Sequence, residues 1–396
     1  MVVSILGTSG AFKGQEPCVP AKNEEGTIKF QSAKYHSEVL GKKSGVYKNA
    51  TEFLLESYDD KFVFIGTTCA IDFQKIVLEE ALTNKDVQFV SIEDDSLDDI
   101  FEKILELLQE NDDVVLDITH GFRHQPIMAI FASTLSQFLE RKDLKIIFAK
   151  EVVMFKEYRY IYLDEYIEIT QISLLLTGFI RTFNFIPVKS MKLLNNEVFE
   201  AFSKSLLSND MRGVEKNYVL LKQELTRLEE NKEFKHISNL ILKVKEELAL
   251  LDMLAFFEPY QKYMVLSKLM VEKNYLIVAL AYVFESVREY CSYCFEDICQ
   301  GIAFENDYER NHTVMGVIGG FSRDNKIVRR YRNIYVLNKR AFREVNKLYN
   351  KLRKRRNDLA HINRTKEFAR IKEDLEKLIS DVEVLFNRGL LDDIKI

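Results

Sequence analysis

The stretch Val114-Val115-Leu116-Asp117-Ile118-Thr119-His120-Gly121 indicates the fold of the first part of the chain. Its apolar half has the length and composition of a buried strand. Polar residues and a glycine follow, and Pro126 then stands where the first turn of a helix over residues 127–139 would begin. The stretch therefore predicts a strand, a turn and a helix.

The same pattern is repeated through about the first 170 residues. We predict strands at 2–6, 27–30, 62–66, 87–92, 114–118, 144–149 and 158–163, and helices at 49–57, 71–82, 97–108 and 127–139. Strand and helix units of this length favour right-handed crossovers. The predicted first domain, residues 1–175, is therefore an α/β Rossmann-like domain with a largely parallel sheet and helices on both faces.

Three of these strands end in small hydroxyl or glycine residues. The three turns are Gly7-Thr8-Ser9, Gly66-Thr67-Thr68 and Thr119-His120-Gly121. Parallel sheets bind ligands at the carboxyl ends of their strands, and backbone N–H groups at such turns suit phosphates. The sequence has no GxGxxG or GxxxxGK[ST] motif, which argues against a dinucleotide enzyme or a P-loop nucleotidase. The pattern predicts a phosphate-rich ligand, and it leaves open whether Asp117 and His120 are catalytic, metal-binding or structural.

From about residue 180 the pattern changes to long amphipathic helices. We predict helices at 211–230, 234–254, 260–299, 339–362 and 368–386, with a loop at 311–325 and a passage between domains at 164–188. The second domain, residues 176–396, is therefore predicted to be all-helical.

Composition excludes several classes of protein. The chain has 396 residues, a net charge of −5 and 47% hydrophobic residues, which is ordinary for a soluble globular protein. An N-terminus without a basic leader and the absence of a ~20-residue apolar run predict a cytoplasmic protein without a membrane span. The cysteines are odd in number and do not indicate a disulfide framework, and Cys291-x-x-Cys294 lacks the second pair that a zinc site requires, so no metal is expected.

The most concentrated positive charge lies at the end of the helix predicted at 339–362, in Arg353-Lys354-Arg355-Arg356-Asn357-Asp358-Leu359-Ala360-His361. Asn357 and His361 are four residues apart and share a helix face that lies opposite the apolar stripe. An imidazole can transfer protons, and the Arg356 guanidinium can neutralise a pentavalent phosphate. These groups could cleave RNA without a metal, by attack of a ribose 2′-hydroxyl on the adjacent phosphate. The alternative is a solvated basic face.

The two motifs in this order resemble those of one family. A strand followed by Asp117-x-Thr119-His120-Gly121, and then a helical domain with Arg356-Asn357-x-x-x-His361, is similar to the CRISPR-associated DxTHG-motif proteins, the CARF–HEPN ancillary ribonucleases of type III CRISPR systems. The resemblance spans the whole chain.

The resemblance implies a CARF domain that binds cyclic oligoadenylate and a HEPN domain that cuts single-stranded RNA at a site shared by two protomers of a homodimer, which could pair further. It places Arg356, Asn357 and His361 in the catalytic motif and Asp117, Thr119, His120 and Gly121 in the ligand motif. Gly7, Thr8 and Ser9 occupy the turn that lines the ligand pocket, and Thr67 and Thr68 are added here as a neighbouring strand end. Cyclic tetra-adenylate is the activator that we favour, although the sequence does not determine the ring size.

Two other functions compete with this one. The protein could be a nucleotide-sensing module whose helical domain binds a partner and cuts nothing. It could also degrade its activator in the CARF pocket, with Thr8, Ser9 or His120 positioning the phosphodiester.

Overall fold

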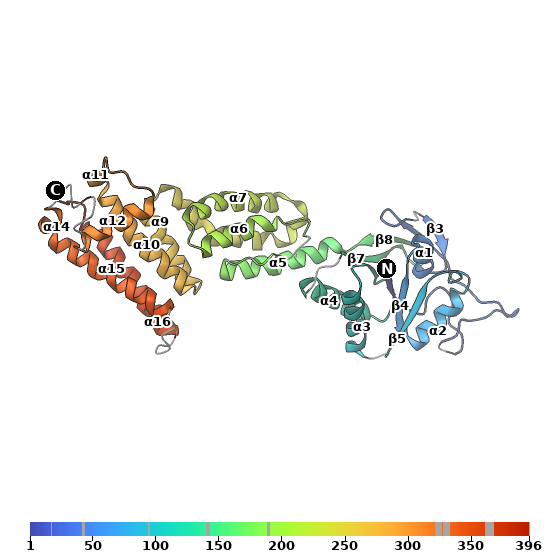
Figure 1. Ribbon diagram of the computed structural model, residues 1–396. Helices are drawn as coiled ribbons and strands as arrows, with labels where there is room; N and C mark the ends of the chain where they lie inside the picture. Colours follow the sequence, from blue (N-terminus) through green and yellow to red (C-terminus); the bar gives the residue numbers. More distant parts are fainter. Residues whose placement is uncertain are drawn as a thin grey trace. The chain divides into compact units, whose positions relative to one another are not determined.

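A computed structural model describes residues 1–16, 18–41, 44–93, 96–139, 143–187, 191–320, 327, 333–360 and 368–395 (Figure 1). The chain forms two compact units, Met1–Ser173 with Val188–Leu194, and Leu174–Pro187 with Asn195–Ile396. The boundary between them falls inside helix α5 (Asp164–Thr182). The first unit is a mixed α/β domain and the second is helical, so the predicted fold class is confirmed.

The described residues of the first unit form one sheet of eight strands in the order β3-β2-β8-β7-β6-β1-β4-β5. The strands are β1 (Val2–Ile5), β2 (Ala33–Ser37), β3 (Ser44–Tyr47), β4 (Phe62–Thr67), β5 (Val87–Ile92), β6 (Asp113–Asp117), β7 (Asp143–Val153) and β8 (Glu157–Tyr162). The run from β5 to β7 is parallel, as predicted. Strand β8 is antiparallel to β7, β2 is parallel to β8, and β3 is antiparallel to β2.

Helices cover both faces of this sheet. They are α1 (Ala50–Ser57), α2 (Thr68–Val77), α3 (Leu97–Glu110) and α4 (His124–Leu139). Figure 1 shows α1 and α2 on one side of the central strands and α3 and α4 on the other. Two hydrophobic clusters correspond to these layers: one contains Phe53 and Phe73, and the other contains Ile104 and Ala129. Strands β1 and β4 lie between the two layers, and their residues are buried throughout.

Local sequence signals fix several helix starts. The side chains of Asn49, Thr67 and Ser96 accept hydrogen bonds from the first turns of α1, α2 and α3. Pro126 lies in the first turn of α4, where its missing N–H is not needed. These caps explain why most predicted elements of the first unit lie within a few residues of the observed ones.

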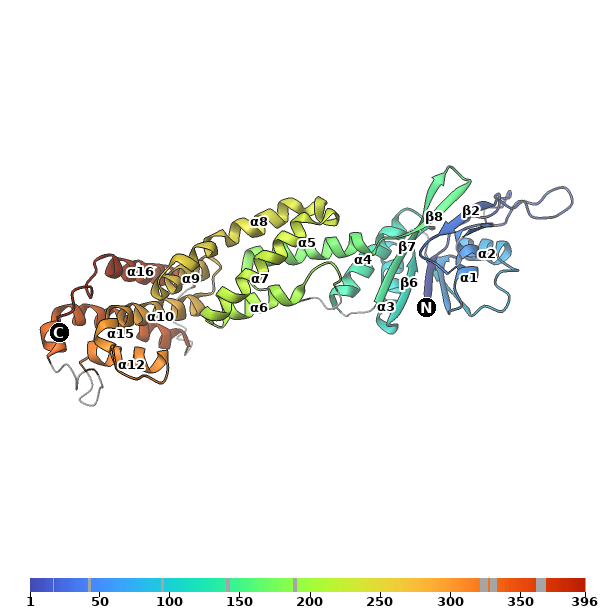
Figure 2. The same cartoon turned by 90° about the horizontal axis from the view of Figure 1, so that it is seen from above.

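One strand prediction for the first unit is wrong, and one strand was missed. Residues 27–30 form only isolated bridges, and the strand lies later, at Ala33–Ser37. The hairpin partner of this strand, β3, was not predicted, because its four residues alternate poorly and include Gly45. Strands β7 and β8 are joined directly as an antiparallel hairpin, which Figure 2 shows beside β6.

The second unit is built from α-helices and short 3-10 helices. Beyond α5 they are α6 (Asn196–Leu207), α7 (Met211–Glu230), η1 (Lys232–Ile237), α8 (Ser238–Leu248), η2 (Ala249–Phe256), α9 (Pro259–Glu272), α10 (Leu276–Cys294), α11 (Glu296–Cys299), α12 (Asp307–Ile318), α14 (Ile334–Leu337), α15 (Lys339–Ala360) and α16 (Phe368–Asn387).

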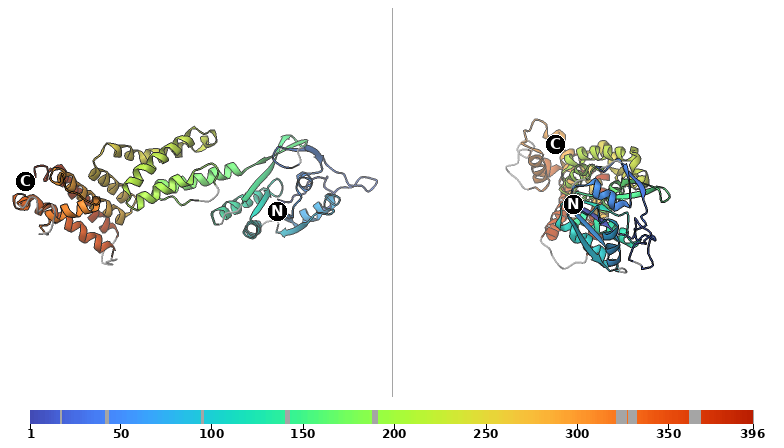
Figure 3. Two further views of the ribbon diagram at one scale, coloured as in Figure 1. Left: turned by 45° about the horizontal axis from the view of Figure 1, so that its top comes forward. Right: turned by 90° about the vertical axis from the view of Figure 1, so that its right-hand side faces the viewer.

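Helix α10 is the centre of the C-terminal bundle. It packs against α9, α12, α15 and α16, and its buried residues extend around most of its circumference. The bundle is the orange and red group of helices in Figure 3.

Helix boundaries in this unit correct three predictions. The helix predicted at 260–299 is divided into α9, α10 and α11, and Asn274 between α9 and α10 has a positive φ of 65° that ends the first of them. The helix predicted at 234–254 is α8 flanked by two 3-10 helices. The predicted loop at 311–325 is partly wrong, because residues 307–318 form α12, which Asn306 caps.

The structure also contains a disulfide, although no disulfide framework was expected from the cysteines in the sequence. A disulfide joins Cys18 to Cys69, across 51 residues of chain, whereas Cys291, Cys294 and Cys299 are free. Among the described residues, no helix has the length and apolar character needed to cross a membrane.

Candidate functional site

The order of the strands reverses at β1. The chain places β4 and β5 on one side of β1, and β6 and β7 on the other. In a parallel sheet such a reversal leaves a crevice outside the carboxyl ends of the two strands that flank it. The turns after β1 and β6 are Gly7-Thr8-Ser9 and Thr119-His120-Gly121, which are two of the three turns singled out in the sequence.

The two turns touch each other. The Ser9 hydroxyl oxygen lies 3.4 Å from Nε2 of His120. A Cβ atom on Gly7 would lie 3.1 Å from the backbone nitrogen of Gly121, so a side chain at position 7 would push the two turns apart by a few tenths of an ångström. Gly121 itself has a φ of +99°, in the region that favours glycine. The structure thus brings together Gly7, Thr8 and Ser9 with His120 and Gly121.

The His120 ring is half-buried in this contact. Burial lowers the pKa of His120 to about 4. The imidazole is therefore neutral near pH 7, with one nitrogen that donates a hydrogen bond and one that accepts. Such a ring can bind the hydroxyl or base of a nucleotide, but it brings no positive charge for a phosphate.

Asp117 lies below the turn and is fully buried. Its carboxylate accepts hydrogen bonds from the Ser4 hydroxyl at 2.7 Å, the Thr119 hydroxyl at 2.5 Å and the Thr119 backbone N–H at 3.2 Å. The Thr119 hydroxyl in turn accepts a hydrogen bond from the Ala149 N–H of β7. Burial raises the pKa of Asp117 to about 6, although the hydrogen bonds from Thr119 and Ser4 oppose the shift. Through these contacts Asp117 and Thr119 hold the carboxyl ends of β1 and β6 together and link them to the middle of β7.

Two buried amides hold the β1 turn from the other face of the sheet, and the sequence reasoning missed both. The Gln74 side chain donates to the carbonyl oxygens of Gly7 at 2.5 Å and Ser9 at 3.0 Å. Asn49 donates to the Ser9 carbonyl at 3.2 Å and to the Gln74 side-chain oxygen at 2.9 Å. One feature of the sequence could have indicated Gln74: it is a glutamine among the apolar residues that α2 buries, Ala70, Ile71, Phe73 and Val77. A buried amide of this kind needs hydrogen-bond partners.

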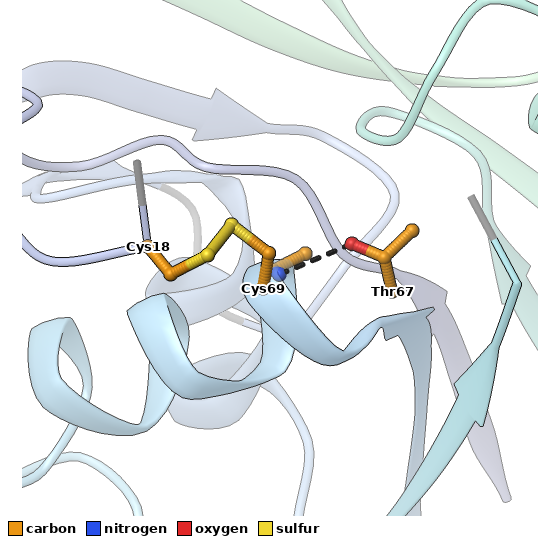
Figure 4. The surroundings of a disulfide bond; sticks show 4 residues. Cys18, Thr67 and Cys69 are labelled. Carbon is orange, nitrogen blue, oxygen red and sulfur yellow. Dashed lines mark hydrogen bonds between the residues drawn. A yellow bond between two sulfur atoms is a disulfide. The ribbon is translucent and has the colours of Figure 1, made fainter. Parts of the chain in front are cut away.

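The third turn has a different structural role. Thr67 is buried and caps α2, accepting a hydrogen bond from the Ala70 N–H (Figure 4). Thr68 is exposed, and its hydroxyl lies 3.0 Å from that of Ser91. Thr68 lines a groove with a volume of about 780 Å³. The Cys18–Cys69 disulfide and the carboxylates of Asp72, Glu93 and Asp99 line the same groove. Carboxylates repel phosphates, so Thr67 and Thr68 lie in surroundings less suited to an anionic ligand than the turns after β1 and β6.

The basic motif lies at the end of α15 in the second unit. Arg356 and Asn357 are exposed, whereas Phe342, Val345 and Leu352 of the same helix are fully buried. Asn357 lies away from these buried residues, and Arg356 lies one turn after Leu352, on the flank of the buried face. Arg355 forms an ion pair with Asp374 of α16. His361 lies outside the described residues.

Arg356 packs on an aromatic ring that the sequence reasoning did not identify. Its guanidinium carbon lies 4.5 Å from the centroid of the Phe284 ring of α10. The Tyr349 ring of α15 stacks on the same phenylalanine, with centroids 4.8 Å apart. Among the described residues, no ion pair is found for Arg356. These ring contacts orient the exposed guanidinium.

A comparison with protein families identifies part of the first unit. Residues 31–152 match the family described as CRISPR system endoribonuclease Csx1, CARF domain. The chain contains a CRISPR-type CARF domain. The match includes the Asp117–Gly121 motif and Thr67 and Thr68, but neither the turn at residues 7–9 nor the helical unit. No curated protein matches the chain.

Proposed function

We propose that the protein is an endoribonuclease of type III CRISPR defence that is activated by cyclic oligoadenylate and cuts single-stranded RNA without a metal. The observation that carries this proposal is the exposed Arg356 guanidinium, next to Asn357 and within an Arg-Asn-x-x-x-His sequence, in a chain whose first unit contains a CARF domain. The family that residues 31–152 match is described as an endoribonuclease, which supports the same reaction class.

The activator would bind at the turns after β1 and β6. Gly7 and Gly121 have no side chains, so a ligand can approach the backbone of both turns closely. Ser9 supplies a hydroxyl group and the neutral His120 an imidazole, which can form hydrogen bonds with ribose or adenine. Asp117, Thr119, Gln74 and Asn49 would hold this surface in shape rather than contact the ligand. A symmetric ring would contact the same turns of two protomers, which is the reason to expect a homodimer.

The reaction would be an internal transfer. The ribose 2′-oxygen attacks the adjacent phosphorus, the bond to the 5′-oxygen breaks, and the products are a 2′,3′-cyclic phosphate and a 5′-hydroxyl end. His361, supplied by both protomers, would remove the 2′-hydroxyl proton and protonate the leaving oxygen. Arg356 would stabilise the charge on the phosphoryl oxygens, and Asn357 would orient the imidazole or the phosphate.

One observation favours a second activity at the CARF site. The Ser9 hydroxyl oxygen lies 3.4 Å from Nε2 of His120, and in the tautomer that leaves Nε2 unprotonated this nitrogen could accept a proton during slow cleavage of the activator. Such cleavage would limit the duration of the RNase activity.

The test is cleavage of a labelled single-stranded RNA in EDTA, without activator and with cyclic tri-, tetra- or hexa-adenylate. The wild type is compared with Arg356→Ala, His361→Ala and the control Arg388→Ala, an exposed arginine after α16 that pairs with Glu344. We expect one ring to start cutting in the wild type and the control, and neither motif variant to cut. A wild type that binds a ring but never cuts would instead indicate a sensing module with a protein partner.

A further inference from the structure

Two exposed aromatic rings lie one helical turn apart on α12. Tyr308 is 67% exposed, and its ring stacks against that of His312 with centroids 6.1 Å apart and planes inclined by 25°. Residues four apart in a helix share a face, so the two rings form one surface. We refer to Tyr308 and His312 as the stacking pair.

A buried guanidinium supports this pair from below. Arg288 of α10 is 8% exposed, and its guanidinium carbon lies 5.1 Å from the centroid of the Tyr308 ring. One Arg288 nitrogen donates to both carboxylate oxygens of Glu285, each at 2.9 Å. Since Glu285 neutralises and fixes the guanidinium, Arg288 cannot swing out to bind an anion. Its role is to hold the Tyr308 ring in place.

The same arginine lies next to the ring that carries Arg356. The Arg288 guanidinium carbon is 6.0 Å from the centroid of Phe284, and the Arg356 guanidinium carbon lies 4.5 Å from that centroid. Helices α10, α12 and α15 pack together here. The stacking pair and Arg356 are therefore connected by a continuous series of ring and guanidinium contacts within one unit.

The charges around the pair favour a base over a phosphate. Asp307 and Glu309 flank Tyr308, and Asp307 contacts Arg212 at 3.3 Å and Arg310 at 3.7 Å. Asp307 and these arginines offset each other's charge, and Glu309 adds a negative charge beside the rings, whereas Arg353, Lys354 and Arg356 at the end of α15 attract phosphate. Aromatic side chains that stack bases beside a cationic track are how proteins bind single-stranded nucleic acid.

We infer that Tyr308 and His312 form a base-stacking subsite that holds one unpaired nucleobase of the RNA substrate beside Arg356. This inference rests on the proposed ribonuclease function and extends it to recognition of the substrate. The bases of a duplex are already stacked on their neighbours, so the subsite would select single-stranded RNA.

The test measures binding of a single-stranded 2′-O-methyl RNA, which lacks the attacking hydroxyl and cannot be cut. Fluorescence anisotropy is measured for the wild type, Tyr308→Ala, Tyr308→Phe and His312→Ala, with Tyr166→Ala as a control, since Tyr166 is a similarly exposed tyrosine in the first unit. Loss of one stacked base costs about tenfold in affinity or more. We expect Tyr308→Ala to weaken binding by about tenfold, His312→Ala by less, and Tyr308→Phe and the control to bind like the wild type.

A second arm separates base stacking from a general effect on folding. A series of oligonucleotides of the same sequence is prepared, and each member lacks the base at one position, which differs from member to member. In the wild type one position should weaken binding about tenfold, and in Tyr308→Ala that position should have no further effect. Equal affinity of the wild type and Tyr308→Ala, an equal loss in Tyr308→Phe, or no RNA binding by the wild type would overturn the inference.

The experiments distinguish failure of the subsite from failure of the proposed ribonuclease activity. If the wild type cuts no RNA with any activator but shows the abasic coupling to Tyr308, the subsite stands and the ribonuclease proposal fails. If activated wild type and Tyr308→Ala cut RNA with equal kcat/KM, the ribonuclease proposal stands and the subsite fails.

Discussion

Ser4 of β1 and Asp117 of β6 are direct partners in the parallel register, and the Ser4 hydroxyl donates a 2.7 Å hydrogen bond to the Asp117 carboxylate. Both residues are completely buried. A carboxylate at this position holds together the two strands whose turns form the candidate ligand site. It also makes the stability of the first unit depend on pH.

Asp117→Asn should remove part of this pH dependence. The pKa of Asp117 is about 6 in the folded protein and 3.8 in the unfolded chain, so folding favours the protonated form. Its stabilising contribution is complete below pH 3.8 and is lost as the pH rises through about 6, a change on the order of 3 kcal/mol. Asparagine can keep the contacts to Ser4 and Thr119 without a charge.

The measurement for Asp117 is chemical unfolding of the wild type and Asp117→Asn between pH 3.5 and pH 7.5. The variant should gain stability relative to the wild type as the pH rises. Asp59→Asn, at a fully exposed carboxylate, serves as the control. A constant difference between wild type and Asp117→Asn across the range would show that the carboxylate does not titrate as described.

His120 should contribute a pH dependence of stability opposite in sign to that of Asp117, and His120→Gln should remove it. The pKa of His120 falls from 6.5 to about 4 on folding, so the unfolded chain takes up a proton first as the pH falls. Wild-type stability is therefore lost between about pH 6.5 and pH 4, and the glutamine variant should lack this loss. Because the ring is neutral, the wild-type Kd for cyclic tetra-adenylate should not change between pH 6 and pH 8 through this residue, and isothermal titration calorimetry would reveal a dependence.

Gln74→Leu should weaken activator binding without altering any residue at the ligand surface. The substitution removes the Gln74 donor from the carbonyl oxygens of Gly7 and Ser9, of which Ser9 keeps only the side-chain donor Asn49, at a cost of about 1–3 kcal/mol in stability. We expect the Kd for the activator to rise roughly tenfold as the β1 turn loosens. Gln88→Leu, at an exposed position of β5, is the matched control, and equal affinities of the two variants would contradict the supporting role of Gln74.

Arg356→Lys should be almost as inactive as Arg356→Ala in RNA cleavage. Lysine keeps the charge, but it lacks the planar fork that stacks on Phe284 and donates two hydrogen bonds to phosphate. We expect both variants to lose about 10² or more in kcat with activator present. Phe284→Leu should lower kcat about tenfold with KM nearly unchanged, because it misplaces the guanidinium without removing it. Full activity of Arg356→Lys would show that Arg356 contributes only its positive charge, and not the geometry of its guanidinium.

Cys69→Ser should destabilise the first unit. The disulfide closes a long loop, across 51 residues, and such bonds typically stabilise by about 2–4 kcal/mol. The melting temperature should fall in the variant and in wild type treated with a dithiol reductant. Alkylation in denaturant should label three of the five cysteines before reduction and all five after it, and five labels before reduction would rule out the bond.

The sequence determined the α/β and helical character of the two parts. Period-two and period-3.6 patterns are local, and so are the caps at Asn49, Thr67 and Ser96. The Asp117–Gly121 motif was also legible, because a polar turn after a buried strand marks the edge of a sheet where ligands bind. Asn357 was found in the same way, from its place opposite an apolar helix stripe, and Arg356 from its place on the flank of that stripe.

Only the tertiary structure decided which residues support these sites. Gln74 and Asn49 lie far in sequence from the turn that they hold, and Phe284 comes from a different helix than Arg356. Such contacts depend on strand order and helix packing, and neither leaves a periodic signal in the chain. The same reason applies to the Cys18–Cys69 bond and to Thr67, whose hydroxyl is used by its own helix rather than by a ligand. Sequence thus determined the elements and the motifs, whereas packing between distant segments determined which polar groups are exposed to a ligand and which are used inside the fold.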